Sequence, residues 1–426
     1  MTDSNAASDA SAIYLATARS RSRWPRNSPQ YCRKVPLASN CDMDLSKNRA
    51  ANLASQGFER TRADTIVLYL CWLSPLTMAS RLFGLTIAIT LLAPSPVHAQ
   101  GLVFDTFRDY IESLRVQARI PGLAVAVIGR DQVLWEHAFG EQDIARAIAA
   151  RTDTPFHLDG VTQVVTAALV LRCVEDGRLR LDDTTSQLRP NSPDADASIR
   201  ELLSHTTVGI DGLQFAYRPE RLDPLSDAVA ACTGQSFRES VGTLLDRLGM
   251  PNSVPGPDVI HIDPVVDYVP PVERYSNVLL RLATPYSKDK EGRLAESSYG
   301  LTTLTASGGL ISSVLDFAWF DLALRNGLLL HTDTLALAWS PPIGSNGLPL
   351  AHGLGWFVDT YADQPVVWQF GVGENASSSI VVTAPERGLT MVAMANSDGL
   401  ATPLRLAAGG LTQSPFARLF LELFVR

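Results

Sequence analysis

The chain has 426 residues, of which 46% are hydrophobic and 19% are charged, and its formal net charge is −8. This composition is that of a globular protein, and it excludes a largely disordered or membrane-embedded chain. The acidic balance gives no electrostatic basis for binding nucleic acid. The length allows one compound domain or two lobes.

An export signal lies at an unusual place, well inside the chain. Met78–Ala99 contains a basic Arg81, an apolar run over 82–93 and a small residue at its end, the pattern of a cleavable signal peptide too short to span a bilayer. We therefore predict that translation starts at Met78 and that residues 1–77 are a wrongly assigned or disordered extension. Cleavage would leave a periplasmic or extracellular protein with 25 basic and 38 acidic side chains and no membrane span.

Hydrophobic periodicity predicts strands near both ends of the mature chain and helices between them. In chain order, the pattern predicts a helix over 104–118, strands over 123–128 and 132–139, a helix from Gly160, a short capped helix from Ser198, helices over 225–233 and 237–248, a proline-rich loop over 251–271, a helix after Gly309, strands over 353–360, 366–370, 378–383 and 389–395, and a closing helix over 416–425. The expected fold is α/β (α+β): an antiparallel sheet built from both chain ends and flanked by helices, plus a mainly helical lobe. The α/β lobe would comprise 100–160 and 300–426, and the helical lobe 161–299.

The stretch 156–183 carries the most specific signal. It predicts an apolar, buried helix that ends at Gly177, where a left-handed C-terminal cap belongs. The first turn of such a helix presents Gly160 and Gln163 to whatever lies beside the core. Gly160 has no side chain, and the amide of Gln163 is not a base at ordinary pH.

This stretch resembles the nucleophile helix of the serine β-lactamase and penicillin-binding-protein family, of the class C or D-Ala-D-Ala carboxypeptidase type. That helix begins with Ser-x-x-Lys and ends at a Gly and a Leu-Asp-Asp turn. Further segments resemble the family in the same order: Leu202–Thr206, Thr233–Phe237, Leu248–Met250, Ser307–Gly309 with Asp316, and Met394–Asn396. The resemblance runs from about 104 to 426, and it implies the β-lactamase/transpeptidase-like fold of a serine hydrolase.

Each catalytic motif that the resemblance implies is degenerate in this chain. The vestigial positions are Gly160 and Gln163 for Ser-x-x-Lys, Tyr217 and Pro219 for Tyr-x-Asn, and Gln369 and Gly371 for Lys-Thr-Gly or His-x-Gly. Loss of a positioned general base alone costs about 10²–10⁴ in rate, and loss of the serine removes the covalent route. We therefore expect no acyl-enzyme chemistry.

Other candidate residues are weaker. Tyr275–Asn277 is a literal Tyr-x-Asn out of order and is interpreted as a turn, while Ser287–Lys290 is a literal Ser-x-x-Lys in a charged stretch without helical period. His205 is expected to be structural. Cys173 and Cys232 are expected to be buried free thiols, with a disulfide as the alternative in an oxidising compartment. The histidines show no metal-ligand spacing, and no cofactor or metal is expected.

Two functions follow from these observations. The first is an exported pseudoenzyme that binds a ligand or partner in the vestigial cleft, or serves as a scaffold. The alternative is a serine-independent or weak hydrolase of the esterase, β-lactamase or peptidase type, in which a water replaces the serine and Tyr217 is the base. A phenol titrates near pH 10 and no lysine remains beside it, so the first function is favoured. A decaying protein without a role is a third interpretation.

The resemblance also predicts where a ligand would bind. In the family, two backbone N–H groups form the oxyanion hole, and these correspond here to Gly160 and Val372. Backbone donors do not depend on side-chain identity, and the first lies at the start of a helix, which favours an anion. We expect a small carbonyl or carboxylate ligand, or a peptidoglycan-like peptide, between these groups and flanked by Tyr217 and Gln369.

Overall fold

The computed structural model describes residues 96–189, 194–261, 271–401 and 406–426. The predicted extension over 1–77 and the predicted signal peptide as far as residue 95 therefore lie outside the described residues. No described helix combines the length and the apolar character that crossing a bilayer requires.

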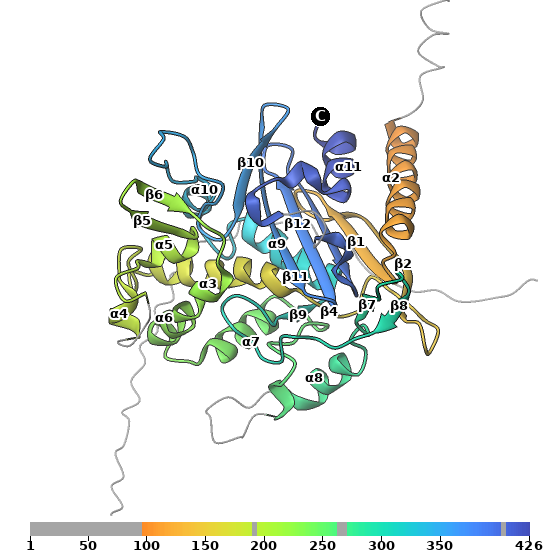
Figure 1. Ribbon diagram of the computed structural model, residues 1–426, viewed down its shortest axis with the longest axis horizontal. Coiled ribbons are helices and arrows are strands. Elements are labelled where there is room, and N and C mark those ends of the chain that lie inside the picture. The colour runs from red at the N-terminus through yellow and green to blue at the C-terminus, as the bar shows by residue number, and fades with distance from the viewer. Residues whose placement is uncertain (1–95, 190–193, 262–270, 402–405) are drawn as a thin grey trace, which may run out of the picture. The chain divides into compact units, whose positions relative to one another are not determined.

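A seven-stranded antiparallel sheet organises the fold (Figure 1), with the strand order β10-β11-β12-β13-β1-β2-β3. The strands are β1 Gly122–Ile128, β2 Val133–Asp143, β3 Ile148–Ala149, β10 Phe357–Tyr361, β11 Gln364–Gly373, β12 Ser377–Ala384 and β13 Leu389–Ala395. β13 pairs with β1 from Leu123 opposite Ala395 to Ile128 opposite Thr390. The sheet is thus assembled from the two ends of the chain, as predicted.

Helices cover both faces of this sheet. Helix α2 (Pro96–Ala118) packs with the C-terminal helix α11 (Pro415–Phe424) on one face, and α3 (Thr162–Glu175) and α9 (Val314–Arg325) contribute to the core on the other. Residues of β1 alternate between the two faces, because successive side chains of a strand point in opposite directions. Leu123, Val125 and Val127 lie in the core beneath α2 and α11, and Ala124, Ala126 and Ile128 lie in the core beneath α3 and α9. This double burial explains why the strand reads as a continuous apolar run.

The middle of the chain is mainly helical and starts from the 3-10 turn η1 (Asp159–Val161), which leads into α3. Its other helices are α4 Thr185–Leu188, α5 Ile199–Leu203, η2 Pro219–Leu222, α6 Pro224–Thr233, α7 Phe237–Arg247, η3 Val259–His261 and α8 Val272–Leu279. Further along the chain lie α10 Thr332–Ala338, η4 Asp398–Leu400, η6 Leu406–Ala408 and η7 Leu411–Gln413. The short strand pairs are β4 Phe156–His157 with β9 Ile311–Ser312, β5 Thr206–Gly209 with β6 Gly212–Phe215, and β7 Tyr286–Lys288 with β8 Leu294–Glu296. Gly177, with φ +69°, follows α3 in the left-handed conformation that was expected.

Three sequence-based expectations need correction. Cys173 on α3 and Cys232 on α6 form a disulfide, with Cα atoms 6.1 Å apart, so the free-thiol interpretation was wrong. The two helices pack against each other, which brings the sulfur atoms together, and periodicity alone does not reveal such packing. Tyr275–Asn277 is not a turn but lies within α8. Ser287 and Lys288 lie on β7 of a hairpin rather than in an irregular stretch.

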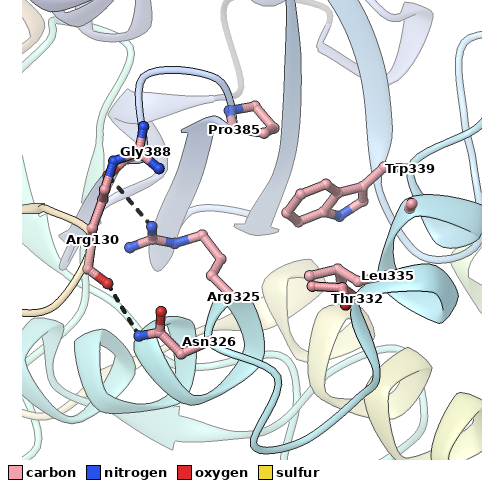
Figure 2. A pocket seen from close by; sticks show the side chains of 9 residues that line it. Arg130, Arg325, Asn326, Thr332, Leu335, Trp339, Pro385 and Gly388 are labelled. Atoms are coloured by element: carbon pink, nitrogen blue, oxygen red, sulfur yellow. Dashed lines mark hydrogen bonds between the residues drawn. The ribbon is translucent and has the colours of Figure 1, made fainter.

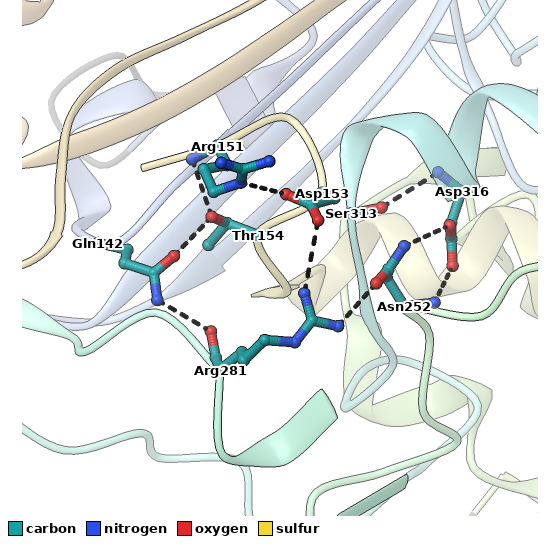
Figure 3. A network of polar contacts seen from close by, with 8 residues as sticks. All are labelled: Gln142, Arg151, Asp153, Thr154, Asn252, Arg281, Ser313 and Asp316. Carbon is teal, nitrogen blue, oxygen red and sulfur yellow. Dashed lines mark hydrogen bonds and ion pairs between the residues drawn. The ribbon is translucent and has the colours of Figure 1, made fainter. Parts of the chain in front are cut away.

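A polar network ties the sheet to the segment around Asn252 and to the start of α9 (Figure 3). Ser313 caps α9 by accepting from the N–H of Asp316, and the Asp316 carboxylate accepts from the N–H of Asn252 at 2.7 Å. Arg281 donates to Asn252 at 2.7 Å, and its own carbonyl accepts from Gln142 of β2 at 3.3 Å. The Ser-x-x-Asp sequence at the start of α9, Ser313 to Asp316, therefore has a structural role: it connects the helix to the segment around Asn252.

Candidate functional site

The vestigial site forms where η1 meets β11. Helix α3 is buried along most of its length, which fixes its first turn against the sheet. Gly160 lies in η1, and Gln163 lies one turn later with its side chain fully buried. Gly160 lies directly against β11, whereas Gln163 bonds to Tyr217, whose ring lies 5.3 Å from that of Phe370 on β11.

No side chain separates η1 from β11. A Cβ atom on Gly160 would lie 2.5 Å from the carbonyl oxygen of Phe370 and 3.1 Å from the hydroxyl of Tyr217. A Cβ atom on Gly371 would in turn overlap the carbonyl oxygen of Leu158 and lie 2.8 Å from the backbone nitrogen of Gly160. Real Cβ atoms do not approach backbone atoms this closely. The two glycines therefore permit a backbone contact that a serine at position 160 would prevent.

A chain of hydrogen bonds occupies the place of the catalytic groups. Gln163 Nε2 donates to the Tyr217 hydroxyl at 2.8 Å, and Gln163 Oε1 lies 2.9 Å from His205 Nε2. The N–H of Arg218 donates to His205 Nδ1 at 3.2 Å. Because Nδ1 accepts, the proton of the neutral ring must sit on Nε2, which donates to Gln163. Both imidazole nitrogens are thus engaged, and neither offers a free lone pair to a substrate.

Burial sets the protonation of these groups. It lowers the pKa of His205 well below its usual range, and the neighbouring His352 and Arg221 lower it further. Burial also raises the pKa of Tyr217, and the hydrogen bond from Gln163 only partly offsets this rise. His205 is therefore neutral, and Tyr217 is a protonated phenol rather than a phenolate base.

Gln369 of β11 joins a second group of hydrogen bonds. Its side chain is fully buried; its Nε2 lies 3.4 Å from His352 Nε2 and 3.3 Å from the carbonyl oxygen of Gly355, and its Oε1 accepts from the N–H of Phe370 at 2.9 Å. His352 Nδ1 donates to the carbonyl of Gly353 at 2.8 Å, and burial lowers the pKa of His352 to about 4. The His205 and His352 rings meet edge to face at 4.8 Å, which joins the two groups.

The structure brings some of the expected site residues together and separates others. Gly160 and Gln163 both lie beside the Tyr217 hydroxyl, whereas Gln369 bonds toward His352 and not toward Tyr217. Pro219 starts η2 and has no side-chain hydrogen-bonding group. Gly160 and Val372, the two expected backbone donors, both remain partly exposed.

Sequence reasoning missed two residues of this region. His352 lies in the irregular segment before β10, where no motif or period marks it. Asp159 directly precedes Gly160, has φ +46° and is 1% exposed. Its carboxylate accepts from Ser377 Oγ at 2.7 Å, and burial raises its pKa to about 6. Nothing in the sequence indicated that Asp159 would adopt a positive φ, because residues other than glycine rarely do so.

Apart from His205, the remaining candidates take no part in the described hydrogen bonds of the site. Tyr275 packs in a small core with Val254 and Ile311. Ser287 and Lys288 belong to the β7–β8 hairpin. His205 alone among them enters the site, where it bonds to Gln163.

Proteins of known identity are similar to this chain. Penicillin-binding protein 4 of Amycolatopsis lactamdurans is 37% identical over 112 residues, which cover 25% of this chain and 29% of that protein. Protein flp of Staphylococcus aureus (strain NCTC 8325 / PS 47) is 25% identical over 97 residues, which cover 21% of this chain and 20% of that protein. The chain thus matches less than 30% of the length of each of these relatives.

Solved structures share the fold over a longer range. The octameric penicillin-binding protein homologue from Pyrococcus abyssi superimposes with a TM-score of 0.60 at 18% identity, covering 75% of this chain and 77% of that one. The D-amino acid amidase from Ochrobactrum anthropi SV3 gives 0.57 at 17% identity, covering 75% and 98%. The class C β-lactamase from Rhodobacter sphaeroides gives 0.55 at 16% identity, covering 74% and 96%. At these identities the likeness establishes the fold alone.

The family model described as Beta-lactamase matches residues 107–409, which include both ends of the sheet and the vestigial site between them. Its extent covers more than half of the sequence, and the fold agrees with that of the solved structures. The chain therefore belongs to the Beta-lactamase family.

Proposed function

We propose that this chain is an exported, catalytically inactive member of its family that acts as a binding or scaffold protein. The observation that carries the proposal is the direct contact between η1 and β11, where a serine side chain would have to lie. The hydrogen-bonded chain from Arg218 through His205 and Gln163 to Tyr217 supports it. This place offers neither a side chain that could act as the nucleophile nor a base that could activate one.

The alternative of a water-dependent hydrolase has less support. A water would have to occupy the space beside Gly160 that Phe370 and Tyr217 already fill. The candidate base, Tyr217, has a raised pKa, so its phenolate is scarce at neutral pH. These two obstacles are independent, and both act against hydrolysis.

The ligand part of the proposal rests on the backbone. The N–H groups of Gly160 and Val372 lie at positions that keep partial exposure, and the acidic carboxyl next to them, Asp159, is engaged by Ser377. We propose that a small carbonyl or carboxylate compound, or a peptidoglycan-like peptide, binds without covalent reaction on the exposed side of Gly160 and Val372, outside the contact between η1 and β11. No cation is present among Gly160, Tyr217, Gln369 and Val372, so affinity is expected to be modest.

Catalytic inactivity is tested by intact-mass analysis after incubation with benzylpenicillin and with a fluorophosphonate probe. We expect no mass increase. Stoichiometric acylation, with the modified residue identified by peptide mapping, would contradict the proposal. A class C β-lactamase treated in parallel confirms that the probes react.

Ligand binding is tested by titrating acetyl-D-Ala-D-Ala into ¹⁵N-labelled protein. We expect the amide resonances of Gly160 and Val372 to shift together, with those of the control residues Gly177 and Gly300 unchanged. Shifts confined to other residues would reject the ligand site and leave the inactivity proposal intact. Export is tested separately: the secreted protein should begin at Gln100, and peptides from 1–77 in it would contradict the predicted start.

A further inference from the structure

A cavity of about 250 Å³ is lined by residues from the turns at one end of the sheet and from α9 and α10 (Figure 2). Arg130 in the turn after β1 and Gly388 in the turn between β12 and β13 form one side of it. Arg325 at the end of α9 lies on this same side, where it donates to the carbonyl oxygens of Gly129 and Gly388. Leu335 of α10 and Trp339 after it form the other side. The vestigial site adjoins the opposite end of β12 and β13, about 20 Å away at about 3.3 Å per residue. The cavity is therefore separate from the family's reaction site.

Arg130 is held in place at this cavity by its contact with Gly388. A Cβ atom on Gly388 would lie 2.5 Å from Arg130 Cγ and 2.8 Å from its Cζ, so the arginine side chain lies directly over a glycine with φ +66°. Arg130 Nη2 also donates to the carbonyl oxygen of Glu386 at 3.0 Å. No carboxylate in the described part of the chain forms an ion pair with Arg130. The exposed Arg130 side chain is thus positioned by backbone contacts and is not paired with a described carboxylate.

Arg325 contributes fixed donors rather than net charge. Its guanidinium pairs with Asp321 at 2.7 Å, and both side chains are less than 10% exposed. Nη2 also donates to the carbonyl oxygen of Gly129 at 2.6 Å, whereas Nη1 makes only a long bond of 3.4 Å to the carbonyl of Gly388. A guanidinium has five N–H groups, so Nη1 keeps donor capacity beyond this long bond.

Most of the remaining lining is apolar, and its two polar side chains are those of Asn326, which donates to the Arg130 carbonyl at 3.1 Å, and Thr332. Leu335 of α10 and the indole of Trp339 lie across the cavity from the two arginines, and Pro385 lies in the same turn as Gly388 (Figure 2). The cavity lining includes two arginines and no carboxylate, although the whole chain carries a net charge of −8. An aromatic and aliphatic wall beside a guanidinium suits a compound that has a flat apolar body and one negative charge.

We propose that this cavity binds a small organic carboxylate with a planar apolar body. The Arg130 guanidinium pairs with the carboxylate, Arg325 Nη1 donates to it, and Trp339, Leu335 and Pro385 hold the apolar part. The volume lies slightly below the usual range of about 300–1,000 Å³ for small-molecule sites and suits a body of no more than two fused rings. The inference does not depend on whether the vestigial site binds a ligand.

The test uses 2-naphthoate as the probe, with binding to the purified protein measured by calorimetry. A fragment of this size is expected to bind with a dissociation constant of about 1 mM. Arg130→Gln should weaken binding by about tenfold, because it removes a charge-assisted hydrogen bond. The matched control is Arg293→Gln, on the β7–β8 hairpin with its side chain 75% exposed, and it should bind like the parent.

The neutral analogue 2-naphthamide separates charge from shape and should bind about tenfold more weakly than the acid. Thermal denaturation of each variant checks that the fold is intact. The inference would be overturned if 2-naphthoate did not bind at a concentration 10 times the expected dissociation constant. It would also be overturned if Arg130→Gln and the parent bound the acid equally, or if the acid and the amide bound equally.

Discussion

Replacing Gly160 with alanine tests whether η1 and β11 are in direct contact. The added Cβ would lie 2.5 Å from the carbonyl oxygen of Phe370, whereas ordinary contacts start at 3.4 Å. One of the two backbones must therefore move by roughly 1 Å. β11 is held between β10 and β12 and cannot move freely. Overpacking of this kind costs about 1–3 kcal/mol of unfolding free energy. Gly160→Ser should cost at least as much.

The control is Gly300→Ala. Gly300 has no atom within 4 Å of an added Cβ and no positive φ, so this change should alter stability by less than about 1 kcal/mol. Urea denaturation followed by circular dichroism gives both values. Equal stability of the two variants would show that η1 and β11 are not in contact, and the closed site would then have to be abandoned. The double variant Gly160→Ser, Gln163→Lys should show little acylation by penicillin, because Pro219 and Gln369 still lack the partners' hydrogen bonds and the groups of such a site act together.

Two further changes test other parts of the fold. Replacing Cys173 and Cys232 with alanine opens a loop closed over a sequence separation of 59 and should lower the unfolding free energy by about 4 kcal/mol on the chain-entropy model; thermal denaturation with and without reductant checks this. Gln163→Leu leaves the Tyr217 hydroxyl and His205 Nε2 without their partner and should cost about 2 kcal/mol or more, read from the denaturation midpoint.

The sequence predicts the sheet well because burial leaves a local record. The apolar run of β1 and the alternation of later strands follow from facing one or two layers of helices. The capping box at Ser198 and Glu201 likewise predicts a helix start, which the structure confirms. Such signals depend on neighbours along the chain, and they are therefore readable without the fold.

The site is less predictable because its contacts join distant segments. Gln163 was recognised as an inert replacement, but its bonds to His205 and Tyr217 span 42 and 54 residues and leave no local pattern. The close approach of Gly160 to Phe370 depends on how β11 packs, as the disulfide depends on how α3 meets α6. His352 was missed for the same reason, since it lies in an irregular segment.

Acid should destabilise this protein through its buried histidines. The pKa of His352 is lowered from 6.5 to about 4 by burial, so the unfolded chain takes up the proton first as pH falls. The stability that neutral His352 contributes is complete above pH 6.5 and is lost progressively down to about pH 4, by about 3 kcal/mol. His205 acts in the same direction, because burial also lowers its pKa.

Asp159 acts in the opposite direction over a similar range. Its pKa is raised from 3.8 to about 6, so its contribution to stability is complete below pH 3.8 and is lost as pH rises through 6. Asp159→Asn removes this compensation and should make the loss of stability between pH 6.5 and 4 steeper than in the parent. His352→Gln removes one of the buried histidines and should make it shallower. Denaturation midpoints measured across this range decide the point: if both variants follow the parent curve in parallel, neither group is buried as the structure has it.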